Sequence, residues 1–422
     1  FNETCAAVGN VLLNYRMFLL HKDAKYLDVA EVALLNNVLA AVNLEGNRFF
    51  YVNPLEADGK YPFNHGTAGR APWFGTACCP SNMARLVPQV PGMTYAHDDT
   101  DLYITFFAES STEIELNGTR VKVEQQTAYP NDGEISVVIQ PAKPTKFRLR
   151  LRIPTWTQHR FVPGELYRYV DSSVEPVTVS VNGERIEAAI EQGFVSIERE
   201  WIEDDRVVLD LPMPVRVTEC HPAVSANANR IAFTRGPFVL CAEGVDNGGA
   251  TQRFFVERVL DSSDAKVWTT RIESGSFLQA EVSAQAVTES GDASAEKLVL
   301  TPYYAWNNRG AGSMTVWFPT RRNLAVYDPH ALPKESVFAE ISASHTAAED
   351  AITAIGDGKF DKWSSGNKVT RWTSRGQPGK PQWVIGRFRE TKNIRSVGVF
   401  WMNRSQGDIG FPEAWSLEIE QN

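Results

Sequence analysis

Two long apolar stretches open the chain. Residues 6–20 (AAVGNVLLNYRMFLL) and 26–42 (YLDVAEVALLNNVLAAV) are apolar at nearly every position, and a short polar break at residues 21–23 separates them. A helix that is apolar on all sides must be covered on all sides. The pattern therefore predicts two buried helices packed as a hairpin.

The next segment has a different composition. Residues 44–77 are rich in glycine, proline, asparagine and aromatic side chains, which is typical of a long ordered loop. Pro80 follows, and proline is well suited to the first turn of a helix. We therefore expect a third, short helix over residues 80–87 (PSNMARLV) as the last helix of a helical region at residues 1–97.

From about residue 98 the hydrophobic pattern has a period of two. Alternating segments occur at residues 102–107, 112–116, 134–139 and 147–153, and the dipeptides Asn-Gly at 117–118 and 182–183 are typical of hairpin turns. This pattern predicts an antiparallel β-sandwich region over residues 98–319. The alternating arginines of residues 147–153 (FRLRLRI) are most simply a solvated sheet face.

The C-terminal part has a weaker pattern. Residues 320–340 lack periodicity and contain two prolines, which indicates a linker. Beyond it, segments 341–360, 371–374 (RWTS) and 381–384 (PQWV) resemble the discoidin-like carbohydrate-binding jelly rolls. We expect a partial β jelly roll of this type over residues 341–422, and a multidomain fold of the α and β class for the whole chain.

Charge and hydropathy exclude two classes of partner. The 42 basic and 51 acidic side chains give a net charge of -9, and no basic stretch gathers into a nucleic-acid-binding face. No run approaches the roughly 18 apolar residues of a membrane span. The first residues carry neither a methionine nor a charged-then-apolar leader. A signal peptide could precede Phe1, so the cytoplasm, the periplasm and the exterior all stay open as compartments.

The cysteines are few and odd in number. The five are spread over 422 residues, which excludes a disulfide scaffold. A lone cysteine is usually a small apolar core residue, and we interpret Cys220 and Cys241 in this way. The adjacent pair Cys78 and Cys79 needs another explanation.

Two short motifs offer ligands for one metal ion. Glu3-Thr4-Cys5 and Cys78-Cys79 supply a carboxylate and three thiols, a plausible tetrahedral set for Zn2+. Residues i and i+2 lie on nearly opposite faces of a helix, so Glu3 and Cys5 must sit at a non-helical entrance. Pro80 restricts Cys79 to an extended conformation and puts the cysteine pair at a helix N-terminus, where the thiolate is favoured. A strained disulfide and a purely structural zinc corner stay open as alternatives.

Five motifs resemble landmarks of glycoside hydrolase family 127 and occur in the same order as in that family. They are Glu3-Thr4-Cys5-Ala6, residues 49–56 (FFYVNPLE), Trp73 with residues 77–82 (ACCPSN), residues 235–237 (RGP) and residues 303–310 (YYAWNNRG). Five ordered motifs between residue 1 and about residue 319 are specific for the family and less specific for its exact substrate.

The resemblance implies a fold, a cofactor and a reaction. The family combines an (α/α)6 barrel with β-sandwich domains, and its zinc ligands correspond here to Glu3, Cys5, Cys78 and Cys79. It implies that Cys78 is the nucleophile of a retaining glycosidase that releases terminal β-L-arabinofuranose from an arabinose-containing glycan. A zinc-bound thiolate would replace the carboxylate that is the usual nucleophile.

The loop before Cys78 carries three residues that are suited to line a sugar pocket. They are Tyr51, His65 and Trp73, which combine apolar rings with polar atoms. The competing interpretation is a hydrogen-bonded loop histidine and a core tryptophan without a role in binding.

The same resemblance implies that part of the family's site lies outside this sequence. The family's acid/base glutamate lies upstream of the Glu-x-Cys motif, which here is before Phe1, and a barrel of six helix pairs needs more than the three helices predicted here. We therefore expect residues 1–97 to be the C-terminal part of the barrel, the fragment to be inactive, and its first two helices to expose apolar surface. The alternative is a non-catalytic carbohydrate-binding or structural protein in which zinc only stabilises the fold.

Overall fold

The computed structural model describes residues 2–170, 175–256, 265–327, 338–346, 352, 380–388 and 416. The chain divides into two units, Phe1–Pro329 and His330–Asn422. In the second unit, β25 (Phe338–Ala343) pairs antiparallel with β26 (Val384–Phe388). The rest of the expected jelly roll at 341–422 and part of the expected linker at 320–340 lie outside the described residues.

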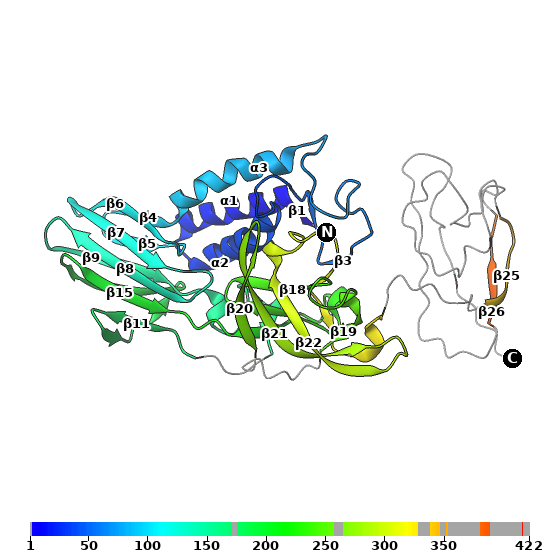
Figure 1. Ribbon diagram of the computed structural model, residues 1–422. Coiled ribbons are helices and arrows are strands. Elements are labelled where there is room, and N and C mark those ends of the chain that lie inside the picture. Colours follow the sequence, from blue (N-terminus) through cyan, green and yellow to red (C-terminus); the bar gives the residue numbers. More distant parts are fainter. Residues whose placement is uncertain are drawn as a thin grey trace. The chain divides into compact units, whose positions relative to one another are not determined.

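The first unit begins with the predicted helical hairpin (Figure 1). Helix α1 spans Thr4–His21, and α2 (Ala24–Val32) continues directly into the π-helical segment η1 (Ala33–Val38). Lys22 ends α1 in a left-handed conformation, and the Asp23 carboxylate caps α2 by accepting the backbone N–H of Lys25 at 3.0 Å. The third helix, α3 (Cys78–Leu86), runs into the 3-10 helix η2 (Val87–Met93).

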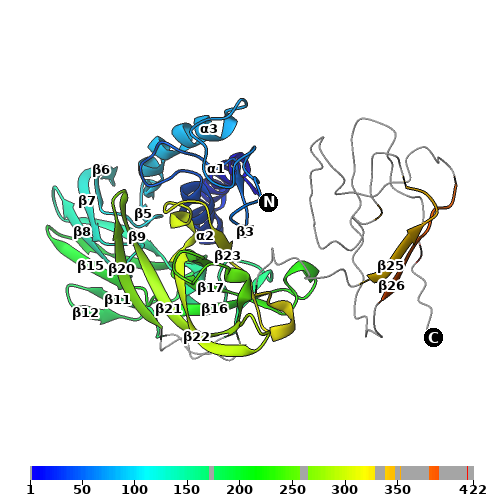
Figure 2. The ribbon, with the colours of Figure 1, turned by 45° about the vertical axis from the view of Figure 1, so that its right-hand side comes forward.

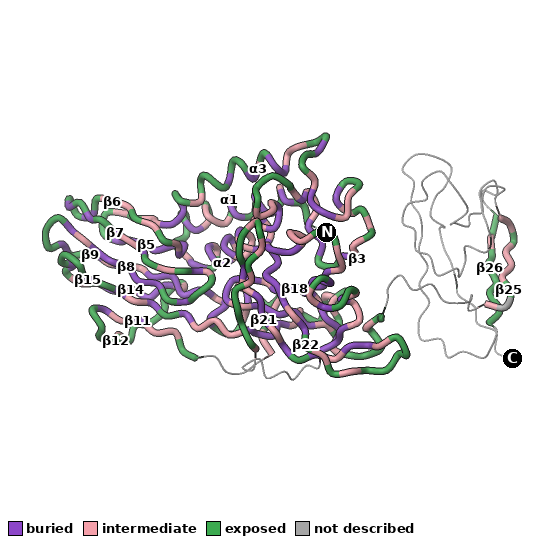
Figure 3. Tube along the Cα trace, in the orientation of Figure 1, coloured by how far each residue is buried: buried purple, intermediate pink, exposed green. Residues whose placement is uncertain are grey.

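The two hairpin helices differ in how they are covered. Leu27 of α2 is fully buried, Val32 packs against the core of a β-sandwich, and Leu35 of η1 packs against the core of a second β assembly. On α1, by contrast, Leu13 and Leu20 are 60% and 75% exposed, and much of this helix is surface in Figure 3. The expected apolar exposure is therefore found on α1 but not on α2.

The described part of the chain is mostly β, with few helices. Its helices are α1, α2 with η1, α3 with η2, and short 3-10 segments, so the (α/α)6 barrel stays an expectation. The 3-10 segments are η3 (Thr155–Thr157), η4 (Ser225–Asn227), η5 (Thr251–Arg253), η7 (Tyr303–Ala305) and η8 (Arg322–Leu324). Within these described ranges, no helix is long and apolar enough to cross a membrane.

Two sheets form the β-sandwich, and Figures 1 and 2 show it beside the helices. One sheet has the order β13-β14-β9-β5-β4 and the other β12-β11-β15-β8-β7-β6; the pair β5 and β9 runs parallel. The strands are β4 (Tyr95–His97), β5 (Asp101–Ile104), β6 (Ser110–Leu116), β7 (Thr119–Thr127), β8 (Glu134–Pro141), β9 (Thr145–Arg152), β11 (Thr178–Val181), β12 (Glu184–Ile186), β13 (Ile190–Glu191), β14 (Phe194–Trp201) and β15 (Asp205–Asp210). Alternate side chains of both sheets meet in one core, as a period of two predicts.

The predicted hairpin turns are confirmed. Asn117 and Gly118 join β6 to β7, and Asn182 and Gly183 join β11 to β12. Their φ angles are 48°, 70°, 51° and 84°. Positive φ at both central residues is what the tightest hairpin turns require, and asparagine and glycine adopt it most readily.

A second assembly of eleven strands contains the later part of the predicted sandwich region, so the prediction of one antiparallel sandwich over residues 98–319 is wrong: this range forms two β assemblies, and one strand pair is parallel. Its main order is β10-β16-β17-β18-β22-β21-β19, with β20, β23, β24 and β3 attached. The strands are β3 (Glu56–Asp58), β10 (Tyr167–Tyr169), β16 (Val215–Cys220), β17 (Arg230–Arg235), β18 (Phe238–Glu243), β19 (Phe254–Phe255), β20 (Lys266–Ile272), β21 (Gly275–Val287), β22 (Ala293–Pro302), β23 (Ser313–Thr315) and β24 (Phe318–Pro319). Because β3 comes from the loop before α3 and pairs with β23, that loop is tied to this sheet.

The arginines of β9 form only in part the solvated face that their alternation suggests, since Arg148 is 38% exposed. Arg152 is fully buried, and its guanidinium pairs with Asp28 (Nη1 to Oδ1, 2.8 Å) and with Glu31 of α2. Arg150 lies nearer the surface and donates from Nε to Asp101 at 3.2 Å. The solvated-face prediction is wrong for Arg152, because α2 packs over this residue.

Candidate metal centre and active site

The structure brings Glu3, Cys5, Cys78 and Cys79 together. One potential ligand atom from each of the four lies within 4.8 Å of the others. The Cys5 and Cys79 sulfurs are 3.3 Å apart, and Glu3 Oε1 lies 3.8 Å from Cys78 Sγ and 3.9 Å from Cys79 Sγ. The first unit therefore contains a candidate metal site built from two segments that are far apart in the sequence.

Glu3 and Cys5 lie on either side of the residue at which α1 begins. Glu3 lies in β1 (Asn2–Glu3) with an extended backbone (φ -80°, ψ 137°), and Cys5 lies in the first turn of α1. Strand β1 pairs with β2 (Val52–Asn53), and the backbone N–H of Thr4 donates to the Tyr51 carbonyl at 3.0 Å. The predicted non-helical entrance is confirmed for Glu3 but wrong for Cys5, which is the second residue of α1.

The cysteine pair opens α3, as predicted, but not with the predicted backbone. Helix α3 begins at Cys78, so Cys79 is helical rather than extended. A proline in the first helical turn removes no intrahelical hydrogen bond, because the N–H groups of that turn have no partner in the helix. The restriction that Pro80 places on the preceding residue is a preference, and the helix start overrides it here.

The cysteines are free thiols, and this includes the vicinal pair. The alternative of a strained disulfide between Cys78 and Cys79 is therefore not what the structure shows. Cys241 is fully buried, in agreement with its interpretation as a core residue. Cys220 is only partly buried, at the end of β16 opposite Tyr167, so the core interpretation is wrong for that residue.

The donor set fits a tetrahedral ion. Metal bonds of about 2.3 Å to sulfur and 2.0 to 2.2 Å to oxygen place tetrahedral ligand atoms about 3.5 to 3.8 Å apart. Glu3 Oε1 lies 3.8 and 3.9 Å from the Cys78 and Cys79 sulfurs, slightly beyond the roughly 3.6 Å of a tetrahedral oxygen and sulfur pair, and the 3.3 Å between the Cys5 and Cys79 sulfurs is shorter than the roughly 3.8 Å of two tetrahedral sulfurs. Shifts of a few tenths of an ångström would bring these atoms to a tetrahedral arrangement. Three thiols with one carboxylate are also the ligand types of a borderline-soft ion.

Hydrogen bonds distinguish Cys78 from the other two thiols. The Tyr51 hydroxyl lies 3.3 Å from Cys78 Sγ, and this hydrogen bond, followed by one with Cys5, lowers the pKa of the Cys78 thiol. Burial raises the pKa of Cys5 and Cys79. The Asn82 amide donates to Cys5 Sγ at 3.2 Å and orients it. Cys78 is thus the thiol that most readily becomes a thiolate.

The three aromatic or polar loop residues do not share one location. The Tyr51 and His65 rings lie 4.4 Å apart, and both pack edge-on to the buried Phe74. His65 is exposed and has a left-handed backbone (φ 51°). Trp73 is 61% exposed and packs edge-on to Phe49 instead. The structure brings Tyr51 to Cys78 and His65 to Tyr51, whereas Trp73 contacts neither of these rings in the described structure.

The sequence patterns do not identify two loop residues that hold this arrangement. The buried Asn64 amide accepts the backbone N–H of Tyr51 at 2.8 Å and donates to the Gly69 carbonyl at 2.9 Å. The buried Arg70 donates to carbonyl oxygens on two other segments. Asparagine and arginine are ordinary surface residues in a polar loop, so composition alone gives no sign that these two are buried.

Models of a single family match most of the first unit. The catalytic domain of β-L-arabinofuranosidases of family GH127 matches residues 1–92, the middle domain matches residues 101–213, and the glycoside hydrolase family 127 C-terminal domain matches residues 215–319. These three matches follow one another in the order of the helical region, the β-sandwich and the second β assembly.

Relatives with known names agree with these models. A non-reducing end β-L-arabinofuranosidase of Bifidobacterium longum subsp. longum is 30% identical over 342 residues, which cover 75% of this chain and 49% of that protein. A solved GH127 β-arabinofuranosidase is 38% identical, with a TM-score of 0.72, and the match covers 77% of this chain and 50% of the other. A GH127 β-L-arabinofuranosidase from Geobacillus stearothermophilus T6 is 34% identical, with a TM-score of 0.66 and coverage of 76% and 50%.

The chain spans about half the length of the relatives that it matches. Within that span, the family's catalytic, middle and C-terminal domains occur once each and in order. The chain therefore belongs to glycoside hydrolase family 127, the β-L-arabinofuranosidase family.

Proposed function

We propose that this chain supplies the metal centre and the nucleophile of a retaining β-L-arabinofuranosidase. The convergence of Glu3, Cys5, Cys78 and Cys79 on one point, with the Tyr51 hydroxyl on the Cys78 sulfur, is the observation that supports it most directly. The substrate class is an arabinose-containing glycan with a terminal β-L-arabinofuranose, as the relatives' names suggest.

The ion we propose is Zn2+, held by Glu3, Cys5, Cys78 and Cys79. Thiolate sulfur is a preferred ligand of zinc, and zinc accepts a carboxylate in the same tetrahedral set. Bound zinc would supply a positive charge that keeps the coordinating thiols deprotonated at neutral pH.

Cys78 is the nucleophile in this proposal. Its side chain is partly exposed, whereas Cys79 is buried, and it lies at the first position of α3, where the helix dipole favours an anion. Its sulfur attacks the anomeric carbon and forms a C–S bond while the glycosidic C–O bond breaks. Water then cleaves the C–S bond, and two displacements return the original configuration.

Proton transfer to the departing oxygen needs a second group. Glu3 is a poor candidate, because a carboxylate bound to a metal ion does not readily give up a proton. The acid/base glutamate that the resemblance places upstream of Glu3 stays an expectation, and we assign this role to no residue of this chain.

Tyr51 and His65 are the sugar-facing residues in this proposal. The Tyr51 hydroxyl contacts the Cys78 sulfur and the His65 ring packs against the Tyr51 ring, and each residue combines a ring surface with a polar atom, which suits a sugar ring and its hydroxyls. Trp73 lies on exposed surface nearby, where a large ring is suited to a further sugar unit of the glycan.

One observation favours the competing function. Four protein ligands normally mark a closed, structural zinc site, whereas catalytic zinc keeps an open position. In that case the chain is a non-catalytic carbohydrate-binding or structural protein whose metal only ties β1 and α1 to α3. The nucleophile hypothesis requires instead that Cys78 leaves the ion as it attacks.

A trapping experiment separates the two functions. Zinc-loaded protein is incubated with 2,4-dinitrophenyl β-L-arabinofuranoside, whose weakly basic dinitrophenolate needs little help from an acid as it leaves. The nucleophile hypothesis predicts the addition of one pentosyl group on Cys78, located by peptide mass spectrometry. Cys220→Ser, in the second β assembly, serves as the matched control and should label like the unaltered protein. Zinc binding without any adduct at Cys78 would favour the structural alternative.

A further inference from the structure

Arg70 is a buried cation that forms no ion pair in the described part of the chain; Glu243, the carboxylate whose charge acts on it, pairs with Arg309. The residue is 5% exposed, and burial lowers the pKa of its guanidinium to about 9. Nε and Nη2 donate to the Ala40 carbonyl at 3.0 and 2.8 Å, Nη1 to Trp306 O at 2.7 Å, and Nη2 to Tyr304 O at 3.3 Å. The guanidinium also stacks on the Phe50 ring, 4.4 Å from its centroid. A charge that forms no direct ion pair is costly to bury, so this residue should do more than fill space.

The partners of Arg70 come from three different parts of the first unit. Ala40 ends the helical segment that starts with α2, and Tyr304 and Trp306 belong to the segment 303–310 of the second β assembly. Phe50 directly precedes Tyr51. One side chain therefore joins the helical hairpin, the second β assembly and the loop that contacts the cysteine cluster.

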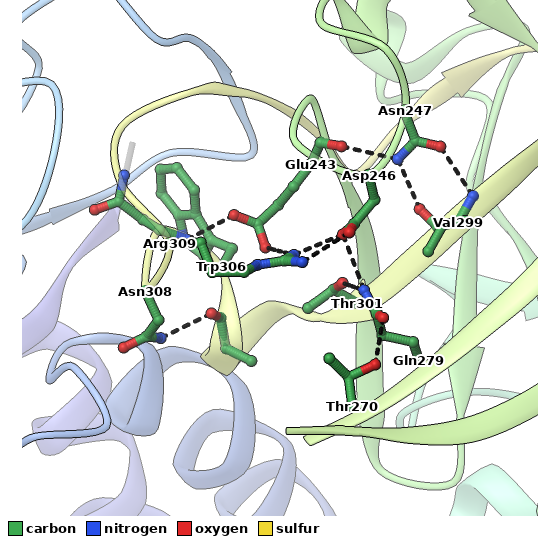
Figure 4. A network of polar contacts seen from close by, with 12 residues as sticks. Glu243, Asp246, Asn247, Thr270, Gln279, Val299, Thr301, Trp306, Asn308 and Arg309 are labelled. Atoms are coloured by element: carbon green, nitrogen blue, oxygen red, sulfur yellow. Dashed lines mark hydrogen bonds and ion pairs between the residues drawn. The ribbon is translucent and has the colours of Figure 1, made fainter. Parts of the chain in front are cut away.

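The segment 303–310 is a firm anchor for this side chain (Figure 4). Arg309 pairs with Glu243 (2.7 Å) and Asp246 (2.6 Å), and Glu243 accepts the backbone N–H of Asn307 at 2.9 Å. Figure 4 shows this network continuing from Asp246 to Gln279 of β21. The same segment also binds the backbone of the loop that carries Arg70, since Asn307 Oδ1 accepts the backbone N–H of Arg70 at 3.2 Å.

Two short series of hydrogen bonds connect the surroundings of Arg70 to the candidate metal ligands. Its neighbour Gly69 accepts a hydrogen bond from Asn64, and Asn64 accepts the backbone N–H of Tyr51, whose hydroxyl contacts Cys78. The carbonyl of Phe50, the ring on which Arg70 stacks, accepts the hydroxyl of Thr4 at 2.9 Å. Thr4 lies between the ligands Glu3 and Cys5.

We propose that Arg70 is a positioning residue for the metal centre. Anchored on the segment 303–310 and on Ala40, it fixes Phe50 and Tyr51, and through them the places of Glu3, Cys5 and the Cys78 sulfur. The proposal rests on the function proposed above and gives the C-terminal domain of the family a specific task at the site.

A matched pair of variants tests this role. Arg216 resembles Arg70: it is buried, donates to the Gln158 carbonyl at 2.7 Å and stacks on the Tyr169 ring, 3.4 Å from its centroid. Its contacts, however, join the sandwich region to the second β assembly. Arg70→Met and Arg216→Met should both lower the midpoint of urea unfolding. Only Arg70→Met should weaken Co2+ binding, by about tenfold, because groups that orient metal ligands typically change affinity by that much or more. The probe is Co2+ alone, followed by its thiolate-to-cobalt absorption band.

A second variant covers the case in which Arg70→Met does not fold. Arg70→Lys keeps the charge but cannot reach three carbonyl oxygens at once, so it should bind Co2+ with an affinity between those of the unaltered protein and Arg70→Met. If folded Arg70 variants bind Co2+ as tightly and with the same spectrum as Arg216→Met, the positioning role is wrong. If the unaltered protein binds no Co2+ or Zn2+, the proposed metal centre itself is wrong, and the role of Arg70 with it.

Discussion

The hydroxyl oxygen of Tyr51 lies 3.3 Å from the sulfur of Cys78. Tyr51 directly precedes β2, and the partner strand β1 carries Glu3, so one short ladder places a carboxylate and a hydroxyl beside the proposed nucleophile. The surroundings of the Cys78 sulfur are therefore set as much by the loop before α3 as by α3 itself.

Metal removal should change the reactivity of the cluster cysteines. In zinc-loaded protein, coordination should protect Cys5 and Cys78 from iodoacetamide, and a zinc chelator should raise their alkylation rates several-fold because the thiols become available. Peptide mass spectrometry after timed labelling measures each site. Cys220, partly exposed, should react equally with and without chelator, and the fully buried Cys241 should stay slow. Equal labelling of Cys78 in both conditions would speak against a shared ion.

The ion pair between Lys22 and Asp98 should give a small dependence of stability on pH. Partial burial alone would raise the pKa of Asp98, but hydrogen bonds from Lys22 and from the backbone N–H groups of Thr100 and Asp101 lower it to about 2. A lowered carboxyl pKa stabilises the fold above the unfolded value, about 3.9, and this contribution is lost as the pH falls through about 2. Both side chains are well exposed, so the effect should stay below about 1 kcal/mol.

Urea unfolding of Asp98→Asn checks this dependence. The variant should be slightly less stable than the unaltered protein at neutral pH, and the difference should shrink below about pH 4. Asp99→Asn changes a neighbouring exposed carboxylate and should show no such trend. A difference that is independent of pH would contradict the assigned role of the Asp98 charge.

Local patterns in the sequence were sufficient for several elements and for the proximity of the four candidate ligands. The apolar stretches predict α1 and α2, the Asn-Gly dipeptides predict two turns that have positive φ at both residues, and the motifs around Glu3 and Cys78 predict four side chains that the structure brings together. These features depend on neighbours in the chain, or on motifs that a family shares.

Features that depend on packing between distant segments were not predictable in this way. Alternation in β9 shows that Arg152 faces away from the sandwich core, but not that α2 covers that face. In the same way, nothing local to Arg70 shows that its partners lie at Ala40 and Trp306. A charged residue that is buried by a remote segment has the same local sequence as an exposed one.

The exposed apolar side of α1 should promote self-association. Leu13 and Leu20 are 60% and 75% exposed, and apolar side chains on one helix face attract one another in water. The double substitution Leu13→Gln with Leu20→Gln should reduce association in sedimentation velocity while changing the free energy of unfolding by less than about 1 kcal/mol. Val11→Gln, at a fully buried position of the same helix, should instead destabilise the fold by about 2 kcal/mol or more. Unchanged association of the double variant would show that this face is not responsible.

The buried network around Arg152 should be a main determinant of how α2 is held on the sandwich. Arg152 is enclosed with Asp28 and Glu31, and Glu31 also accepts the Tyr129 hydroxyl at 2.8 Å. Burial raises the pKa of Asp28, and Arg152 is the largest influence that opposes this rise.

Arg152→Met should therefore lower the free energy of unfolding by about 3 to 5 kcal/mol, because it leaves two carboxylates buried without their cation. Arg148→Met, on the same strand but 38% exposed, should cost less than about 1 kcal/mol. Adding Asp28→Asn and Glu31→Gln to Arg152→Met should recover part of the loss, since neutral amides are less costly to bury than unpaired charges. Urea unfolding monitored by tryptophan fluorescence measures all three variants. An Arg152→Met protein as stable as Arg148→Met would show that water or a rearranged α2 compensates the two carboxylates, and that this network does not hold the helix in place.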